Sequence, residues 1–260
     1  MGAQLLLIFV AYHPSEREVD ILIHSLESLP SNISYAVVCN DYKPGEPVDK
    51  LQANASHFLR ISANLGYGRA VNKMVSYVGT LPKFIGILNT DLSWAVGTFE
   101  SIIDWTLAND DVALVVPRII NSAGSTEKLC KQNPTILGML SRRFIPNVLK
   151  PHCLKSYDDW YSMTYKDYNE IIESTYLSGC CMIARTASFL QVHGFDERYF
   201  LYLEDADLTR TLSSVGRCIY FPHVSVVHKW GRGNYKSLRL LIINLWSSCL
   251  YFSKWGLSIW

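Results

Sequence analysis

The sequence lacks three features that would each point to a particular class of protein. Its 24 basic and 23 acidic side chains leave a net charge of only +1, whereas proteins that grip nucleic acid are usually basic. No apolar run reaches the roughly 18 residues of a membrane span. The seven cysteines include no Cys-x-x-Cys pair, which disfavours a disulfide framework or a structural zinc site. We therefore expect a cytoplasmic protein with no nucleic-acid partner.

The chain also lacks a recognisable signal peptide. Apart from Gln4, its first ten residues are apolar, but they include no basic segment. The run stops at Tyr12-His13-Pro14 without the small residues of a cleavage site. We therefore predict that this run is a buried first strand.

The chain contains enough apolar residues to form a sizeable core, because 49% of its 260 residues are hydrophobic. In the first half, short apolar runs alternate with stretches of helical spacing. We predict strands at Leu5–Ala11, Ser34–Cys39, His57–Ile61, Phe84–Leu88 and Val112–Val116, and helices at Glu16–Leu29, Gly68–Val78 and Thr98–Ala108. This alternation predicts an α/β fold, in which helices flank a mostly parallel central sheet.

The second half is less regular. Residues 121–173 are rich in proline and aromatic side chains, and they predict either a lid or acceptor-side insertion or a plain surface excursion. Beyond them we predict strands at Ser178–Ala184, Arg217–Phe221 and Val224–Val227, and helices at Ala187–Val192 and Ala206–Ser214. Ligands of such sheets bind beyond the carboxyl ends of the strands, so the loops starting at Ala11, Asn40, Ser62 and Asn89 are predicted to face one site.

The densest candidate for chemistry is an acidic segment, residues 194–208. Glu204, Asp205 and Asp207 stand at the start of a helical pattern, where acids complement the helix dipole. Helix capping explains one or two of these acids. It does not explain an acidic pair that directly follows Tyr-Phe-Leu-Tyr-Leu.

Three weaker signals accompany the acidic pair. Asn89-Thr90-Asp91 ends a predicted strand, where Asn and Asp are also ordinary turn residues. Asn64-Leu65-Gly66-Tyr67-Gly68 precedes a predicted helix, and its glycines suit close approach to a phosphate, although the dinucleotide-binding pattern is absent. His228 ends the last predicted strand, where packing is the alternative to a ligand role.

In their order along the chain, these motifs resemble the family 2 glycosyltransferases of the GT-A fold. The similarity is greatest to the bacterial rhamnosyltransferase-like members that build O-antigen and related surface polysaccharides. It spans about residues 4–228, and its specific part is Leu177–His228. The resemblance implies a Rossmann-like nucleotide-diphospho-sugar transferase fold and sugar transfer to an acceptor hydroxyl with inversion. It suggests dTDP-rhamnose as the first expectation for the donor, and a UDP-sugar as the second.

The resemblance also implies roles at the acidic pair and at the metal. Asp205 would be the general base, and Glu204, with Gly179, would position the acceptor. Asp91 and His228 would hold a divalent cation, Mn²⁺ or Mg²⁺. Such a cation can stabilise the charge of a departing nucleoside diphosphate, and one carboxylate is enough for direct inversion.

The donor site carries two departures from the family pattern. Asn89 stands where a full Asp-x-Asp motif has its first acid, which puts the affinity for metal in doubt. Many relatives carry Asp-Asn after the second strand, whereas this chain has Asn40-Asp41. The residues expected to bind the donor are Ala11, Tyr12, Asp41, Asn64, Gly66, Asn72, Asn89 and Asp91.

Two other functions stay open on the sequence. A nucleotidyltransferase would need a glycine-rich basic loop near the first strand, which residues 11–17 do not resemble. A non-catalytic sugar-nucleotide-binding subunit of a polysaccharide assembly complex would bind without turnover, and the Glu204-Asp205 pair argues against it.

The tail, residues 229–260, is predicted to be an appendage to a domain of residues 1–228. Basic residues (Lys229, Arg232, Lys236 and Arg239) precede an apolar stretch, Leu240–Phe252, and tryptophans follow it. Such a helix suits the headgroup boundary of a bilayer. We therefore expect a peripheral protein on the inner face of the cytoplasmic membrane, near a lipid-linked saccharide acceptor. The alternatives are a helix packed on the domain and the contact of a homodimer.

Overall fold

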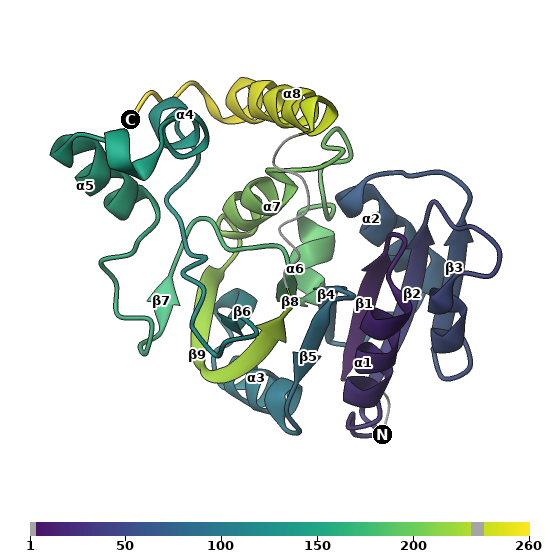
Figure 1. The fold of residues 1–260 in the computed structure, drawn as a ribbon. Helices are drawn as coiled ribbons and strands as arrows, with labels where there is room; N and C mark the ends of the chain where they lie inside the picture. The colour runs from purple at the N-terminus through teal and green to yellow at the C-terminus, as the bar shows by residue number, and fades with distance from the viewer. Residues whose placement is uncertain (1–3, 230–236) are drawn as a thin grey trace.

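The computed structural model describes residues 4–229 and 237–260. Its first half is a parallel sheet with the strand order β3-β2-β1-β4. Every residue of β1 is buried because helices cover both faces of the sheet (Figure 1). The strands are β1 (Leu5–Ala11), β2 (Ile33–Asn40), β3 (His57–Ile61) and β4 (Phe84–Asn89).

Alternate residues of β1 point into two separate cores. Leu5, Leu7 and Phe9 pack with side chains of α1 and α3 on one face. Leu6 and Ile8 pack with side chains of α2, α6 and α7 on the other. The helices are α1 (Glu16–Leu26), α2 (Tyr67–Val78), α3 (Thr98–Leu107), α6 (Thr186–Gln191) and α7 (Glu204–Leu212), and a short 3₁₀ helix, η1 (Pro47–Leu51), precedes β3.

The second half of the sheet is mixed. β8 runs antiparallel to both β4 and β6, whereas β6 and β9 are parallel. β5 and β7 each pair with β9 in antiparallel fashion, so β9 is hydrogen-bonded to β5, β6 and β7. These strands are β5 (Leu92–Trp94), β6 (Val112–Ile120), β7 (Ile172–Glu173), β8 (Cys181–Arg185) and β9 (Arg217–His228).

Several predicted boundaries need correction. The two strands predicted at Arg217–Phe221 and Val224–Val227 are one strand, β9, with a shift of register across residues 222–224. The strand predicted from Ser178 begins only at Cys181, because residues 178–180 form the turn that faces the site. The first helix ends at Leu26, ahead of Pro30.

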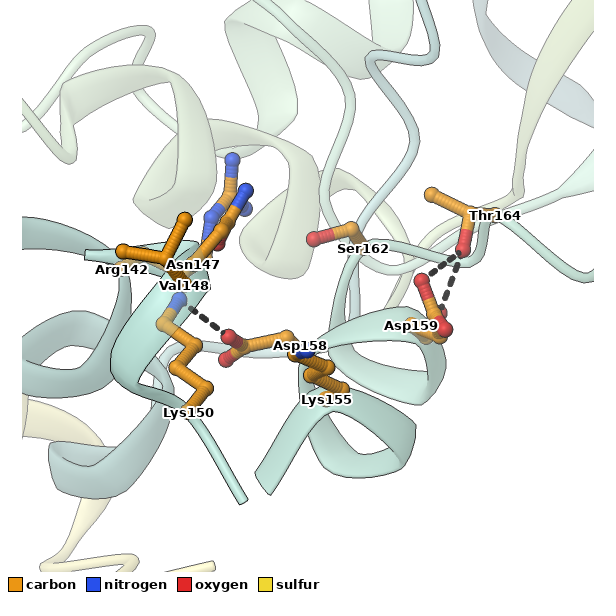
Figure 2. A pocket seen from close by; sticks show the side chains of 9 residues that line it. All are labelled: Arg142, Asn147, Val148, Lys150, Lys155, Asp158, Asp159, Ser162 and Thr164. Atoms are coloured by element: carbon orange, nitrogen blue, oxygen red, sulfur yellow. Dashed lines mark hydrogen bonds and ion pairs between the residues drawn. The ribbon is translucent and has the colours of Figure 1, made fainter. Parts of the chain in front are cut away.

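The irregular middle of the chain forms a helical hairpin at one end of the molecule (Figure 1). The ammonium of Lys150 donates to Asp158 at 2.5 Å (Figure 2). The buried hydroxyl of Ser141 also donates to Asp158, at 2.6 Å, and the two bonds fix the hairpin. A cavity of about 690 Å³ lies between its arms. We call this segment the α4–α5 hairpin; it comprises α4 (Ile136–Phe144), the 3₁₀ turn η2 (Asn147–Leu149) and α5 (His152–Tyr161).

The C-terminal helix α8 (Leu238–Trp255) lies above α7 and beside α4 (Figure 1). Tyr251 is fully buried, in a cluster that includes Leu203 and Ala206 at the start of α7. Within residues 4–229 and 237–260, no helix has the length and apolar character needed to cross a membrane. Of the basic residues predicted to flank this helix, Arg232 and Lys236 lie outside the described residues.

Candidate functional site

A cavity of about 230 Å³ opens where strand ends from both halves of the sheet meet. It brings together five of the predicted site residues, which come from the end of β4, the turn before β8, the start of α7 and the end of β9. These residues are Asn89, Gly179, Glu204, Asp205 and His228.

A strained turn delivers the acidic pair to this cavity. Tyr202 and Leu203 both have left-handed backbone conformations, with φ of 71° and 65°. Side chains other than glycine rarely adopt this conformation, and two in succession occur where the surrounding structure enforces them. The turn places Glu204 and Asp205 in the first turn of α7.

Backbone amides orient the carboxylate of Asp205. The amide of Gly179 donates to Oδ2 at 3.0 Å, and that of Ala206 donates to Oδ1 at 2.9 Å. A Cβ atom at residue 179 would lie 2.9 Å from the Cβ of Asp205, so glycine is needed for this approach. Gly179, predicted to bind the acceptor, therefore also positions the predicted base.

The two acids differ in their electrostatic surroundings. Burial, together with the negative charge of Asp205, raises the pKa of Glu204 to about 8. Burial also raises the pKa of Asp205, but Lys131 and the amides of Gly179 and Ala206 oppose that rise. We infer that at neutral pH Glu204 holds a proton and Asp205 is the carboxylate.

Glu204 also has an unsatisfied oxygen. Its Oε2 atom is buried and finds no hydrogen-bond partner among the residues that the structure describes. Glu204 lines the cavity, so a substrate hydroxyl could satisfy this atom.

A pairing between distant strands brings Asp91 to His228. β5 pairs with β9 so that Leu92 lies opposite His228, and the amide of Lys229 donates to the carbonyl of Asp91 at 3.0 Å. As a result, Nε2 of His228 lies 3.0 Å from Oδ2 of Asp91. The sequence placed both residues at strand ends, but it did not predict β5, which joins them.

The Asp91–His228 pair fits a divalent cation. The second carboxylate oxygen of Asp91 is buried and has no hydrogen-bond partner in the described part of the chain. An oxygen and an imidazole are suitable ligands for Mn²⁺. Residues 4–229 and 237–260 contain no group of three or more His, Cys, Asp or Glu side chains that could hold the ion. Water or the phosphates of a donor would complete its coordination.

The predicted donor loop is bound to the strand beside it. Oδ1 of Asn64 accepts from the side chain of Asn40 at 3.0 Å and from the amide of Gly66 at 2.9 Å. Gly66 has a φ of 86°, and a Cβ there would lie 2.2 Å from the carbonyl oxygen of Phe200. Glycine at this position lets the loop pack against the segment that leads to the acidic pair.

The remaining predicted donor residues lie outside the 230 Å³ cavity. Ala11 is buried at the end of β1, and Tyr12 is exposed beside His13. His13 contacts Asp41 at 3.2 Å and also bonds to Glu46, and the bond to Glu46 is the main cause of its raised pKa.

The amide of Asn72 is bound to a loop. Its nitrogen donates to the carbonyl of Phe195 at 2.8 Å, and its oxygen accepts from the amide of Phe195 at 3.0 Å. In this structure, Asn72 therefore holds the loop ahead of the acidic segment.

Sequence reasoning missed several residues of the site. Asn40, rather than Asp41, bonds to the donor loop, because its side-chain oxygen accepts from the amide of Leu65. The hydroxyl of Tyr67 donates to the carbonyl of Gly179 at 3.2 Å. Glu127 lines the cavity from the irregular middle of the chain, where no pattern marked it.

Comparison with curated proteins identifies rhamnosyltransferases. The chain is 28% identical over 234 residues to N-acetylglucosaminyl-diphospho-decaprenol L-rhamnosyltransferase of Mycobacterium tuberculosis, covering 85% of this chain and 74% of that protein. A stretch of 52 residues, which is 20% of each chain, is 42% identical to rhamnosyltransferase WbbL of Escherichia coli. No family model matches the chain.

Solved structures give the same fold. GalNAc-T7 with UDP, GalNAc and Mn²⁺ matches 98% of this chain with a TM-score of 0.68 and 13% identity. Mannosyltransferase PcManGT of Pyrobaculum calidifontis, in complex with GDP-Man and Mn²⁺, matches 98% with a TM-score of 0.64 and 13% identity. The chain spans 48% and 64% of those chains. The GT-A fold and the resemblance to rhamnosyltransferase-like glycosyltransferases are thus confirmed.

Proposed function

We propose that the protein is an inverting glycosyltransferase that moves a sugar from a nucleoside-diphosphate donor to a hydroxyl of a saccharide acceptor. One observation carries the proposal: a carboxylate oriented by two backbone amides, that of Asp205, lies in the cavity that His228 also lines. The names of the curated relatives support rhamnose as the sugar and a lipid-linked saccharide as the acceptor. We propose that the reaction belongs to the synthesis of a surface polysaccharide.

The reaction can be derived from the side chains. The acceptor oxygen forms a bond to the anomeric carbon as the bond from that carbon to the diphosphate breaks. Asp205 takes the hydroxyl proton, since each of its oxygens keeps a second lone pair beyond its backbone bond. Protonated Glu204 adds no second negative charge and can bond to the acceptor. A divalent cation held by Asp91 and His228 would neutralise charge on the leaving diphosphate.

Replacement of the proposed base tests the assignment. Asp205→Asn keeps the shape but cannot accept the proton, so transfer should fall by about 10²- to 10⁴-fold while donor binding is retained. Nucleotide release is measured with dTDP-rhamnose and UDP-sugars, with and without Mn²⁺ or Mg²⁺, and donor binding by thermal shift. The control is Asp104→Asn, an exposed acid of α3. Undiminished transfer by Asp205→Asn would remove Asp205 as the base.

The same donor screen addresses the non-catalytic alternative. Binding of a sugar nucleotide without turnover, across a panel of donors and acceptors, would favour a binding subunit.

The proposed acceptor also suggests where in the cell the protein acts. A lipid-linked saccharide is held at a membrane, so we place the protein on the inner face of the cytoplasmic membrane. The exposed side of α8 supports this placement. It carries Leu238, Ile242, Leu245 and Trp246 at helical spacing, and α8 contains no acid.

A further inference from the structure

The α4–α5 hairpin presents apolar side chains to solvent at its tip. Val148 is 88% exposed, Leu149 is 72% exposed and Phe144 is 55% exposed. Such residues on the surface of a soluble domain mark an interaction site when they gather in one patch. A membrane contact at this tip rests on the proposed function, because a lipid-linked acceptor requires the protein to reach a membrane.

Exposed apolar residues also lie on the C-terminal tail, which is bound to the other end of α4. The first turn of α4 is bound to the tail, since the amides of Ile136 and Leu137 donate to the carbonyls of Ser258 and Ile259, both at 3.0 Å. The adjoining tail residues Leu257 and Trp260 are 69% and 76% exposed. α4, α8 and the C-terminus lie along the same side of the molecule (Figure 1).

The charge of this region is strongly one-sided. Between Glu127 and Asp158 the sequence contains no acid, and the hairpin carries Arg142, Arg143 and Lys155 at its surface, whereas Lys150 is paired with Asp158. Arg142 and Arg143 lie in the last turn of α4, next to the apolar tip. Basic side chains beside exposed apolar ones suit an anionic bilayer surface.

The hairpin is built to hold its tip in place. Lys150 and Ser141 are buried against Asp158, and Figure 2 shows the ion pair across the base of the tip. Pro146 and Pro151 bracket η2 and restrict its backbone. A tip fixed in this way loses little conformational freedom when it enters the headgroup region. Its insertion therefore costs less entropy than the insertion of a flexible loop.

We propose that residues 144–149, at the tip of the α4–α5 hairpin, insert into the headgroup region of an anionic membrane next to the outer face of α8. The hairpin and α8 then form two contacts with one bilayer. Met139 of α4 and Tyr251 of α8 both pack in the buried cluster at the start of α7, so the two contacts would set the distance between the acidic pair and the lipid surface.

Vesicle binding by the full chain tests this surface. Val148→Asp should lower the partition coefficient at least tenfold on vesicles of phosphatidylcholine with about 30% phosphatidylglycerol. The matched control is Val96→Asp, because Val96 is 78% exposed in the loop between β5 and α3. Trp246→Ser reports the contribution of α8. Substitution of a side chain as exposed as Val148 leaves the core intact, and circular dichroism checks that the variant is folded.

Binding equal to that of the Val96→Asp control, with only Trp246→Ser defective, would overturn the role of the hairpin. A second outcome would also overturn it: the wild-type chain does not bind vesicles, and it forms a dimer in sedimentation experiments that Val148→Asp dissociates. Vesicle binding is measured without substrate. Transfer to a water-soluble acceptor is measured separately and should be unchanged in Val148→Asp, so failure of this proposal and failure of the proposed function are distinguishable.

Discussion

One buried carboxylate connects the helix of the acidic pair to the C-terminal helix. Asp207 is 2% exposed, two residues after the proposed base. Its Oδ2 accepts from the ammonium of Lys254 at 2.7 Å, and its Oδ1 accepts from the indole nitrogen of Trp255 at 2.7 Å. We predict that Asp207→Ala loosens the packing of α8 on α7.

The size of the effect follows from what the substitution leaves behind. Removal of one partner of a buried ion pair costs about 3–5 kcal/mol, because the other charge stays buried. The side chain of Lys254 is 26% exposed and also lies 3.3 Å from Asp196, so we expect the lower end, about 3 kcal/mol. At about 2–4 °C per kcal/mol for a chain of this size, the melting temperature should fall by about 6–12 °C.

Urea and thermal unfolding, followed by tryptophan fluorescence, measure this loss. The matched control is Asp111→Ala, which breaks an exposed ion pair with Arg217 and should cost under about 1 kcal/mol. In a double-mutant cycle, Asp207→Asn and Lys254→Met should show a coupling energy of about 1–3 kcal/mol. If Asp207→Ala costs no more than Asp111→Ala, and the cycle shows no coupling, the carboxylate does not hold α8.

Three further predictions concern the cavity and the loop beside it. Because the pKa of Glu204 is raised to about 8, the folded state keeps a proton that the unfolded state releases above about pH 4.5. The free energy of unfolding should therefore fall as pH rises from about 4.5 to 8, and Glu204→Gln should flatten this slope in urea titrations; an unchanged slope would contradict the assignment. Asp91→Asn should weaken the Mn²⁺-dependent part of donor binding at least tenfold in calorimetric titrations, whereas equal Mn²⁺ dependence would exclude Asp91 as a ligand. Gly66→Ala should destabilise the chain by several kcal/mol more than Gly79→Ala, which has a similar φ of 73° but no described atom within 4 Å of its added Cβ; equal losses would mean that the contact with Phe200 does not matter.

The first half of the fold was predictable because its strands are buried on both faces. Leu5–Ala11 and His57–Ile61 match the observed strands at both ends. A buried strand appears in the sequence as a short continuous apolar run, which is a local signal. β5 has three residues and depends on pairing with β9, so no local pattern revealed it.

The helices of the hairpin were missed for a different reason. The apolar residues of α4 include Leu140 and Phe144, which face solvent, whereas its buried residues are Gly138 and Ser141. The apolar pattern of α4 therefore does not mark the face that packs on the molecule, and α4 is shorter than the roughly 11–18 residues over which helical periodicity is assessed.

The features of the candidate site likewise include some that a local pattern predicts and others that arise only when distant segments meet. The acidic pair was predictable because two adjacent acids after an aromatic run are unusual, and the family resemblance implied Gly179. The contact between Asp91 and His228, and the approach of Tyr67 to Gly179, join segments far apart in the chain. Their geometry exists only once the sheet has formed.

Two of the four residues before the acidic pair accept hydrogen bonds through their carbonyls. The carbonyl of Phe200 accepts from the amide of Tyr67 at 3.2 Å, and that of Leu201 accepts from the hydroxyl of Ser247 in α8 at 2.8 Å. The next two residues, Tyr202 and Leu203, are the left-handed pair. Evolutionary drift in this segment is therefore limited by backbone shape, and replacements that tolerate a positive φ, such as Asn and Gly, would be the ones to persist at Tyr202.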